Sequence, residues 1–426
     1  MLFTDSSPLA YDQVALTISA TDRLILQQLA YQVAVLAERP LEAEKRQLWL
    51  RHNALQPTRP LVFCDPENGW HEIFPANRLA CQGGLARQWE FALRKEIFWG
   101  DQMQDDRVIA DAFDVAHVYT TTGWGLETPT IGGAHGGAYR WASPVQSMND
   151  IDQMHFPHID IDETATARVL ELAHDVFDNY LTVRLRTKWW WSLGLTWNLA
   201  ALRGLQQLML DFFDQPALIH RLMALLRDGA LSMLDSLEAR NLLSLNQAND
   251  YVGSGGFGWT NALPQPDFTG KVRLCDLWGF AESQETVGIS PAMFEEFVFP
   301  YQLPLLERFG LNCYGCCEPL DKRWHIVQRF PHLRRISVSP WANRAFMAEM
   351  LGDRYIYSLK PNPADLALPE FEEERIRLRL RLDLYTARNC RVEVIMKDNH
   401  TIANDPQRVI RWVQIAKEEA TRLVWG

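Results

Sequence analysis

The sequence predicts an α/β protein, a (β/α)₈ TIM barrel with an N-terminal helical extension. Helical and apolar strand-like segments alternate with short links from about residue 165 onward. About eight strand candidates share roughly 250 residues, which favours a closed barrel over an open sheet. We expect the extension over 1–110 and the barrel over 111–426. No Ser/Gly linker divides them, so they should form one elaborated domain.

The extension is predicted from helical periodicity. Apolar residues recur at helical spacing over 21–53, and Pro57 and Pro60 end the pattern. The apolar run 61–65 then predicts a short strand, and a second helix is expected over 84–99.

The rest of the chain is predicted from its alternating pattern. Strands are expected at 183–191, 242–246, 271–279, 311–317, 334–340, 354–359 and 390–398. Helices are expected at 164–183, 198–213, 216–241, 291–309, 320–330, 343–351, 370–386 and 406–424. The stretch 253–258 matches GxGxxG, but Pro264 and Pro266 argue against the helix that a dinucleotide site needs. We expect a mobile loop over the barrel mouth there.

Composition excludes several functional classes. Of the 426 residues 47% are hydrophobic, enough for a large core and against global disorder. Lys and Arg number 42 and Asp and Glu 53, and the resulting charge of −11 disfavours nucleic acid. No apolar run reaches the roughly 18 residues of a membrane span. The N-terminus shows no signal-peptide pattern, and seven cysteines, an odd number, fit a reducing compartment, so we expect a cytoplasmic protein.

The sharpest local feature is the cluster of Cys313, Cys316 and Cys317, followed by Glu318. Chemistry in a barrel lies at the carboxyl ends of the strands, where this cluster is expected. Side chains alternate along a strand, so Cys317 should face the mouth and Cys316 the other face. A thiolate is a good zinc ligand, which favours Cys317. The ordinary alternative is that these cysteines fill the core.

Two further residues are expected at strand ends. His400 follows the last strand in the run 397–400 and could be a zinc ligand, an acid–base group or a solvated loop residue. Asp276 is expected to orient a substrate or activate a nucleophile. The run 188–191 (KWWW) is expected to form an apolar wall, with ligand stacking as a further role. The residues expected to contact a substrate are Trp278, Glu282, Gln284, Tyr314, Lys360 and Asp398.

Four stretches carry a resemblance to a known family: 289–311, 314–324, 333–343 and 397–418. They resemble the uroporphyrinogen decarboxylase superfamily over about residues 165–426. The barrels of that superfamily include decarboxylases of haem synthesis and zinc methyltransferases that serve corrinoid proteins.

The resemblance implies a zinc site. In the methyltransferase branch zinc is held by a His-x-Cys pair and by a Cys after the last strand. These positions fall here on Gly315, Cys317 and His400, so the family His is absent and the last Cys is replaced by His. Glu318, Cys316 or Asp276 could supply the third ligand. The decarboxylase branch has paired arginines in its N-terminal run, and the comparable stretch 59–70 lacks them, which argues against uroporphyrinogen decarboxylation.

The resemblance therefore implies a zinc-dependent methyltransferase. It would move a methyl group between a small O- or N-methylated substrate and either a corrinoid on a partner protein or a thiol. Asp276, His400 and Glu318 are the expected catalytic residues. We expect no nucleic-acid or membrane partner, and a homodimer is the candidate assembly. Two alternatives stay open: a metal-independent decarboxylase or lyase that uses Asp276 and His400, and a non-catalytic binding protein that uses the aromatic cavity.

Overall fold

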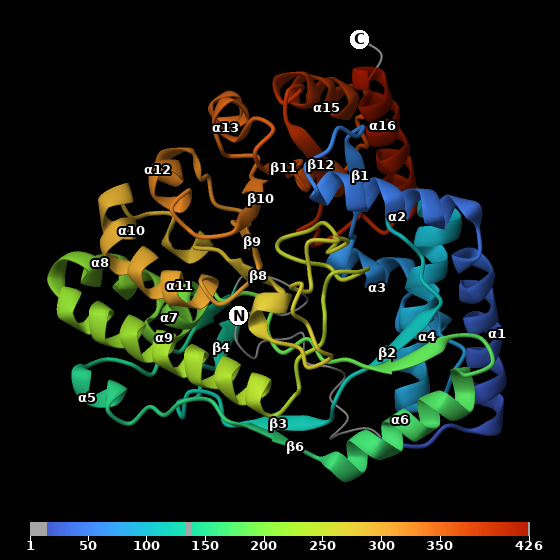
Figure 1. The fold of residues 1–426 in the computed structure, drawn as a ribbon, viewed down its shortest axis with the longest axis horizontal. Helices are drawn as coiled ribbons and strands as arrows, with labels where there is room; N and C mark the ends of the chain where they lie inside the picture. Colours follow the sequence, from blue (N-terminus) through green and yellow to red (C-terminus); the bar gives the residue numbers. More distant parts are fainter. Residues whose placement is uncertain (1–14, 133–138, 425–426) are drawn as a thin grey trace.

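The centre of the protein is a parallel β-sheet (Figure 1), seen in a computed structural model that describes residues 15–132 and 139–424. The strand order is β1-β12-β11-β10-β9-β8, and every neighbouring pair is parallel. The strands are β1 (Leu61–Cys64), β8 (Trp278–Ala281), β9 (Leu311–Tyr314), β10 (Leu333–Val338), β11 (Ile356–Leu359) and β12 (Arg391–Met396). The predicted α/β class is confirmed.

The N-terminal part is mainly helical but also supplies a strand to the sheet. Its helices are α1 (Ala20–Ala37), α2 (Pro40–Asn53), α3 (Trp70–Ile73) and α4 (Gly84–Ile97). The single helix expected over 21–53 is two helices, because Pro40 lacks an N–H and starts α2. The strand expected at 61–65 is β1, which pairs with β12. The domain boundary at residue 110 stays a prediction, and β1, before it, belongs to the central sheet.

From β8 onward helices alternate with strands. Each connection returns the chain to the end of the sheet where the parallel strands begin. The remaining helices are α5 (Met148–Ile151), α6 (Glu163–Phe177), α7 (Thr196–Arg203), α8 (Leu205–Asp214), α9 (Pro216–Ala239), α10 (Pro291–Phe297), α11 (Phe299–Leu306), α12 (Trp324–Val327), α13 (Arg344–Leu351), α14 (Ala364–Ala367), α15 (Glu373–Thr386) and α16 (Gln407–Val424). In α16, Val409, Trp412, Val413 and Ala416 recur at helical spacing and are buried. Because the strands are parallel, the carboxyl ends of β8 to β12 lie at the same end of the sheet.

Two further strands form a separate parallel pair. These are β2 (Ala112–Val115) and β7 (Thr182–Leu185). The remaining strands form two antiparallel pairs, β3 (Tyr119–Thr121) with β6 (Ile159–Ile161) and β4 (Thr130–Gly132) with β5 (Tyr139–Trp141). Within residues 15–132 and 139–424, no strand pairing joins β2 or β7 to the central sheet, so strand hydrogen bonds do not close the predicted barrel.

Side chains cap both outer strands of the central sheet. The backbone N–H groups of Val62 and Cys64 in β1 donate to the carboxylates of Asp106 (2.7 Å) and Asp105 (3.0 Å). At β8 the Asn246 amide donates to the Trp278 carbonyl (3.0 Å) and accepts from its N–H (2.9 Å). The strand expected over 242–246 is therefore wrong. Asn246, the last residue of that stretch, instead uses its side-chain amide to hydrogen-bond the backbone of the outer strand β8, where a neighbouring strand would otherwise pair.

The glycine-rich segment 251–258 runs through the interior, which corrects the mobile loop expected over the barrel mouth. It lies in the yellow part of the chain that crosses the centre of Figure 1, and residues 252–258 are buried. A Cβ at Gly255 would lie 2.3 Å from Cγ2 of Ile395 in β12. One at Gly253 would lie 2.7 Å from Cβ of Cys313 in β9. Glycine is needed because backbone packs directly against the strands. We call residues 251–258 the inner segment.

Gly255→Ala is expected to destabilise the protein by about 3 kcal/mol in urea unfolding. Gly255 has φ +119°, which strains an alanine, and its new methyl group would also clash with Ile395. Gly270→Ala is the matched control, because Gly270 has φ +104° and a Cβ there would meet no atom within 4 Å. An equal loss of stability in both variants would contradict close packing of the inner segment.

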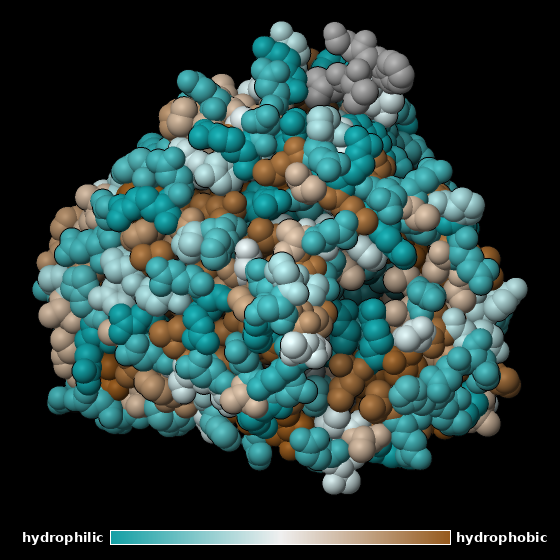
Figure 2. Space-filling view, in the orientation of Figure 1, coloured by the Kyte–Doolittle hydropathy of each residue, from teal (hydrophilic) through white to brown (hydrophobic). Residues whose placement is uncertain are grey.

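The face of the molecule in Figure 2 is mostly hydrophilic, with hydrophobic residues in separate patches between the hydrophilic ones. Among the described residues, no helix combines the length and the apolar character needed to cross a membrane.

Candidate metal and ligand site

Two thiols and a carboxylate converge where β9 and β12 end. The sulfurs of Cys316 and Cys317 lie 3.5 Å apart, and the Cys317 thiol lies 3.1 Å from Oδ2 of Asp398. One donor atom from each of the three residues lies within 4.8 Å of the others. Cys316 is buried and Cys317 and Asp398 are half-buried. We call these three residues the thiol–carboxylate cluster.

A glycine turn places both cysteines on the same side. The expectation that they would face opposite sides is wrong, because β9 ends at Tyr314 and Gly315 has φ +89°. A Cβ at Gly315 would lie 2.7 Å from Leu320, so the turn also needs glycine for space. The alternation of a strand no longer applies to Cys316 and Cys317.

The carboxylate of the cluster comes from Asp398, which was expected to contact substrate. Asp398 is the second residue after β12 and has φ +62°, and its side chain lies against Cys317. His400, the expected ligand and acid–base residue, is exposed and lies outside the cluster. The residue after the last strand that joins the cluster is therefore two positions earlier than the sequence suggested.

Lys397 places a positive charge beside the thiols. Its ammonium lies 3.8 Å from Sγ of Cys316, 3.1 Å from Asp398 and 3.7 Å from Glu67. Burial lowers the pKa of Lys397, but the Cys316 thiolate and nearby acidic groups outweigh it and raise the pKa. Burial raises the pKa of Glu67 to about 7. The lysine is thus held charged against a thiolate.

The pKa values of the two thiols are shifted in opposite directions. The hydrogen bond between Cys316 and Cys317 and the charge of Lys397 lower the pKa of Cys316. The pKa of Cys317 is raised, because its thiol bonds to Cys316 and is buried. The Ser254 hydroxyl of the inner segment also donates to Cys316 (3.1 Å). Of the two sulfurs, Cys316 is therefore the one that loses its proton more readily, and the thiolate is the form that binds metals.

Glu318 shapes the turn and does not join the cluster. It accepts from the N–H groups of Cys316 and Ser283, both at 2.8 Å, and burial raises its pKa. Its expected metal-ligand and catalytic roles therefore stay predictions, and the structure gives it a positioning role. Glu282, expected to contact substrate, is buried and accepts from Ser192 (3.1 Å) and the Gln284 N–H (3.0 Å).

Asp276 lies at the opposite end of the sheet from the cluster, where the strands begin. It ends a short 3₁₀ turn (Leu274–Asp276) before β8 begins at Trp278, so the strand expected over 271–279 starts later. Its carboxylate accepts from the Gln265 N–H (2.9 Å) and from Arg273 (2.9 Å). The expected place of Asp276 at a carboxyl strand end is therefore wrong.

Two other expected substrate contacts are occupied within the protein. The Tyr314 hydroxyl donates to Gln302 (2.8 Å), and its ring packs on Phe330. Lys360 is buried, and its ammonium donates to the Ser254 carbonyl (2.6 Å) and to Ser358 (2.9 Å). Burial lowers the pKa of Lys360 to about 8. Lys360 thus anchors the inner segment.

The cluster opens on one side to a groove. The groove has a volume of about 480 Å³ and is lined by Gln284, Glu285, Val287, Cys317, Glu318, Pro319 and Trp341. Gln284, an expected substrate contact, lies in it. A molecule in this groove could reach Cys317 directly.

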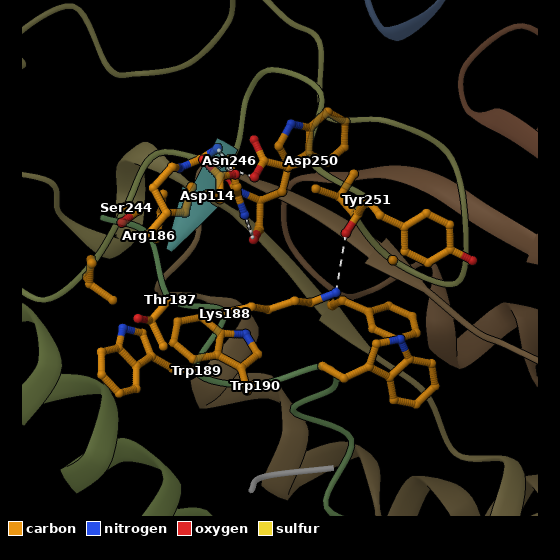
Figure 3. A pocket seen from close by; sticks show the side chains of 17 residues that line it. Asp114, Arg186, Thr187, Lys188, Trp189, Trp190, Ser244, Asn246, Asp250 and Tyr251 are labelled. Carbon is orange, nitrogen blue, oxygen red and sulfur yellow. Dashed lines mark hydrogen bonds and ion pairs between the residues drawn. The ribbon is translucent and has the colours of Figure 1, made fainter. Parts of the chain in front are cut away.

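Aromatic side chains border a second cavity, of about 300 Å³ (Figure 3). Trp191 lines this cavity, packs on Phe280 with ring centroids 5.1 Å apart, and lies 5.6 Å from the Lys397 ammonium. Trp278, an expected substrate contact, also lines it. We call this space the tryptophan cavity. The wall expected from the run 188–191 lies here, beside the thiols.

Sequence reasoning gave no role to Lys397 or Ser254. Lys397 could have been found, because it precedes Asp398 at the end of the last strand. Ser254 could not, because its contact with Cys316 depends on the inner segment running inside the molecule.

Comparison with known proteins gives little beyond this geometry. No protein-family model matches the chain, and no curated protein matches it. Among solved structures, the chain is similar to a methyltransferase from Methanosarcina mazei. The two share 11% identity with a TM-score of 0.46, over 88% of this chain and 97% of that one. So distant a likeness does not establish the family.

Proposed function

We propose that this chain is a methyltransferase that works with a zinc ion held by Cys316, Cys317 and Asp398. The observation that carries the proposal is the convergence of these two thiols and one carboxylate between a groove and an aromatic cavity. Methyl transfer as the reaction follows from the resemblance of stretches 314–324 and 397–418 to the zinc methyltransferase branch.

The donor set fits zinc in chemistry and spacing. A catalytic zinc takes about three Cys, His or Asp ligands and keeps one position open. Bonds of about 2.3 Å to sulfur and 2.0 Å to oxygen at tetrahedral angles put two sulfurs about 3.8 Å apart and a sulfur and an oxygen about 3.5 Å apart. The separations here are 3.5 Å and 3.1 Å. Small side-chain shifts would suffice.

The protein's own residues prepare this site. Lys397 stabilises the thiolate of Cys316, and Glu318 fixes the turn that presents both sulfurs. When bound, zinc would supply a Lewis acid for the heteroatom that carries the methyl group. The methyl–heteroatom bond breaks with its electron pair remaining on the heteroatom, and the acceptor supplies the pair for the new bond. We propose a corrinoid on a partner protein, or a small thiol, as acceptor.

We also propose that β2 and β7 complete a barrel around the inner segment. The two strands are parallel, and Arg186 and Lys188 just after β7 line the tryptophan cavity together with residues of β8. In such a barrel, side chains would fill the two gaps between the β2–β7 pair and the central sheet, where no strands pair.

The metal-independent alternative has no support from the geometry. Asp276 precedes β8 and His400 follows β12, in the same parallel sheet. Asp276 and His400 therefore lie at opposite ends of the parallel strands and are not an acid–base pair.

Asp398→Ala is expected to weaken zinc binding by more than about 100-fold, because it removes one of three ligands. His400→Ala should leave binding unchanged, since His400 is exposed outside the cluster. Zinc per chain is measured by mass spectrometry after dialysis against a graded chelator, and activity by methylation of cob(I)alamin. Wild type should hold one zinc per chain. A wild type without zinc after loading, or zinc lost only from His400→Ala, would refute the site.

A further inference from the structure

The tryptophan cavity has walls built for a flat ring. Trp189, Trp190 and Trp191 come from three consecutive positions after β7 and all line it. The Trp189 indole N–H donates to the Leu242 carbonyl (2.9 Å), and that of Trp278 to the Gly258 carbonyl (3.0 Å). These bonds fix the rings, so the walls are formed before a ligand arrives.

Lys188 is the charged group that the protein leaves to the cavity. Figure 3 shows its side chain extending above the Trp190 ring toward Tyr251. Its ammonium donates to the Tyr251 carbonyl at 3.5 Å and lies 5.7 Å from the Tyr251 ring centre. In the part of the chain that the structure describes, no carboxylate lies within 4 Å of it. The Lys188 side chain is exposed and is one of the residues that line the cavity.

The other cation of the cavity is already neutralised. Arg186 pairs with Asp250 (2.8 Å) and Asp114 (3.4 Å). Protein atoms around Lys188 lower its pKa to about 8 by desolvation. Because Lys188 has no carboxylate within 4 Å among the described residues, an anion on a ligand could pair with its ammonium.

We propose that the tryptophan cavity binds a planar aromatic acid whose carboxylate pairs with Lys188 and whose ring lies against the tryptophans. Resting on the proposed function, this names the substrate class as an aromatic methyl ether or methylamine that carries an acid group. The cavity lies against Trp191, whose ring is 5.6 Å from the Lys397 ammonium beside the cluster. A volume of about 300 Å³ suits a single ring with small substituents.

The test measures binding of 4-methoxybenzoate by isothermal titration calorimetry. Lys188→Met should weaken it by about 30-fold or more, because the ring contacts remain but the charge pair is lost. Lys188→Arg should restore most of the affinity. Lys271→Met, an exposed lysine that does not line the cavity, should bind like wild type. The neutral methyl ester of the same acid should bind wild type more weakly than the acid. Equal binding of ester and acid, or unchanged binding by Lys188→Met, would overturn the proposal.

Binding and zinc dependence are separable. Cys317→Ser should still bind 4-methoxybenzoate within about threefold of wild type, because Cys317 does not line the cavity. If wild type and Cys317→Ser both bind the acid but wild type transfers no methyl group, the proposed function is refuted and the cavity assignment is supported. One zinc per chain without any binding of the acid would refute the cavity assignment alone.

Discussion

Cys317→Ser is expected to remove bound zinc and to lower methyl transfer by more than about 100-fold. Cys317 supplies one of two sulfurs in the cluster and borders the groove. A serine hydroxyl stays protonated at neutral pH and is a weak ligand for zinc. Metal content by mass spectrometry and transfer to cob(I)alamin measure the two effects. Cys275→Ser is the matched control, because Cys275 is also half-buried but lies before β8, at the other edge of the sheet.

Replacement of zinc by cobalt(II) would count the sulfurs. Wild type should show the thiolate-to-cobalt absorption of two thiolates, and Cys317→Ser or Cys316→Ser about half of it. Cys316 is the sulfur whose pKa is lowered, so its loss should cost at least as much affinity. Full zinc content and activity in Cys317→Ser would rule out the cluster as the metal site.

The sequence analysis predicted that Cys317 and His400 would meet. The structure instead brings Cys317 to Asp398, two residues before His400. The choice of His400 failed because Asp398 turns at positive φ, and a sequence pattern does not register such a turn. Cys316 was ranked below Cys317 and kept only as a candidate third ligand, because the alternation of a strand was extended past Gly315, where the strand has already ended.

Strand boundaries explain the failure of Asp276. The apolar run 271–279 reads as one strand, yet Arg273 caps a 3₁₀ turn that ends at Asp276, and the strand begins two residues later. The predicted start at 271 is thus seven residues earlier than the observed start at Trp278 (278 − 271 = 7), and this difference places Asp276 before the strand instead of at its carboxyl end. Local hydrophobicity identifies a strand far better than it fixes its ends.

The interior of the fold depends on contacts remote in sequence. The pattern of strands and helices predicted the parallel sheet correctly, because apolar periodicity is a local property. Asn246 capping β8, and the inner segment packing on Ile395, depend on groups far along the chain. No local pattern shows that a glycine-rich stretch is buried.

Glu393→Gln is expected to lower the free energy of unfolding by about 3–5 kcal/mol. Glu393 lies on β12 and is buried, and its carboxylate accepts from Arg335 at 2.9 Å and from Ser358 at 2.6 Å. Its Oε2 also lies 3.4 Å from Nε2 of His52. The amide keeps the shape but leaves the buried Arg335 guanidinium without its counterion. Urea unfolding at neutral pH measures the loss, and Glu374→Gln, on the exposed face of α15, should change it by less than about 0.5 kcal/mol.

The difference between Glu393→Gln and wild type should shrink in acid. Burial raises the pKa of Glu393, but Arg335 and His52 outweigh it and lower the pKa from 4.5 to about 2. Above pH 4.5 the carboxylate is charged in both states, and its ion pair stabilises the folded one. Between pH 4.5 and 2 the unfolded chain takes up a proton first, so this contribution of about 3 kcal/mol is lost as the pH falls. A difference that stays constant from pH 7 to pH 3 would show that Glu393 stabilises the fold by packing and not by its charge.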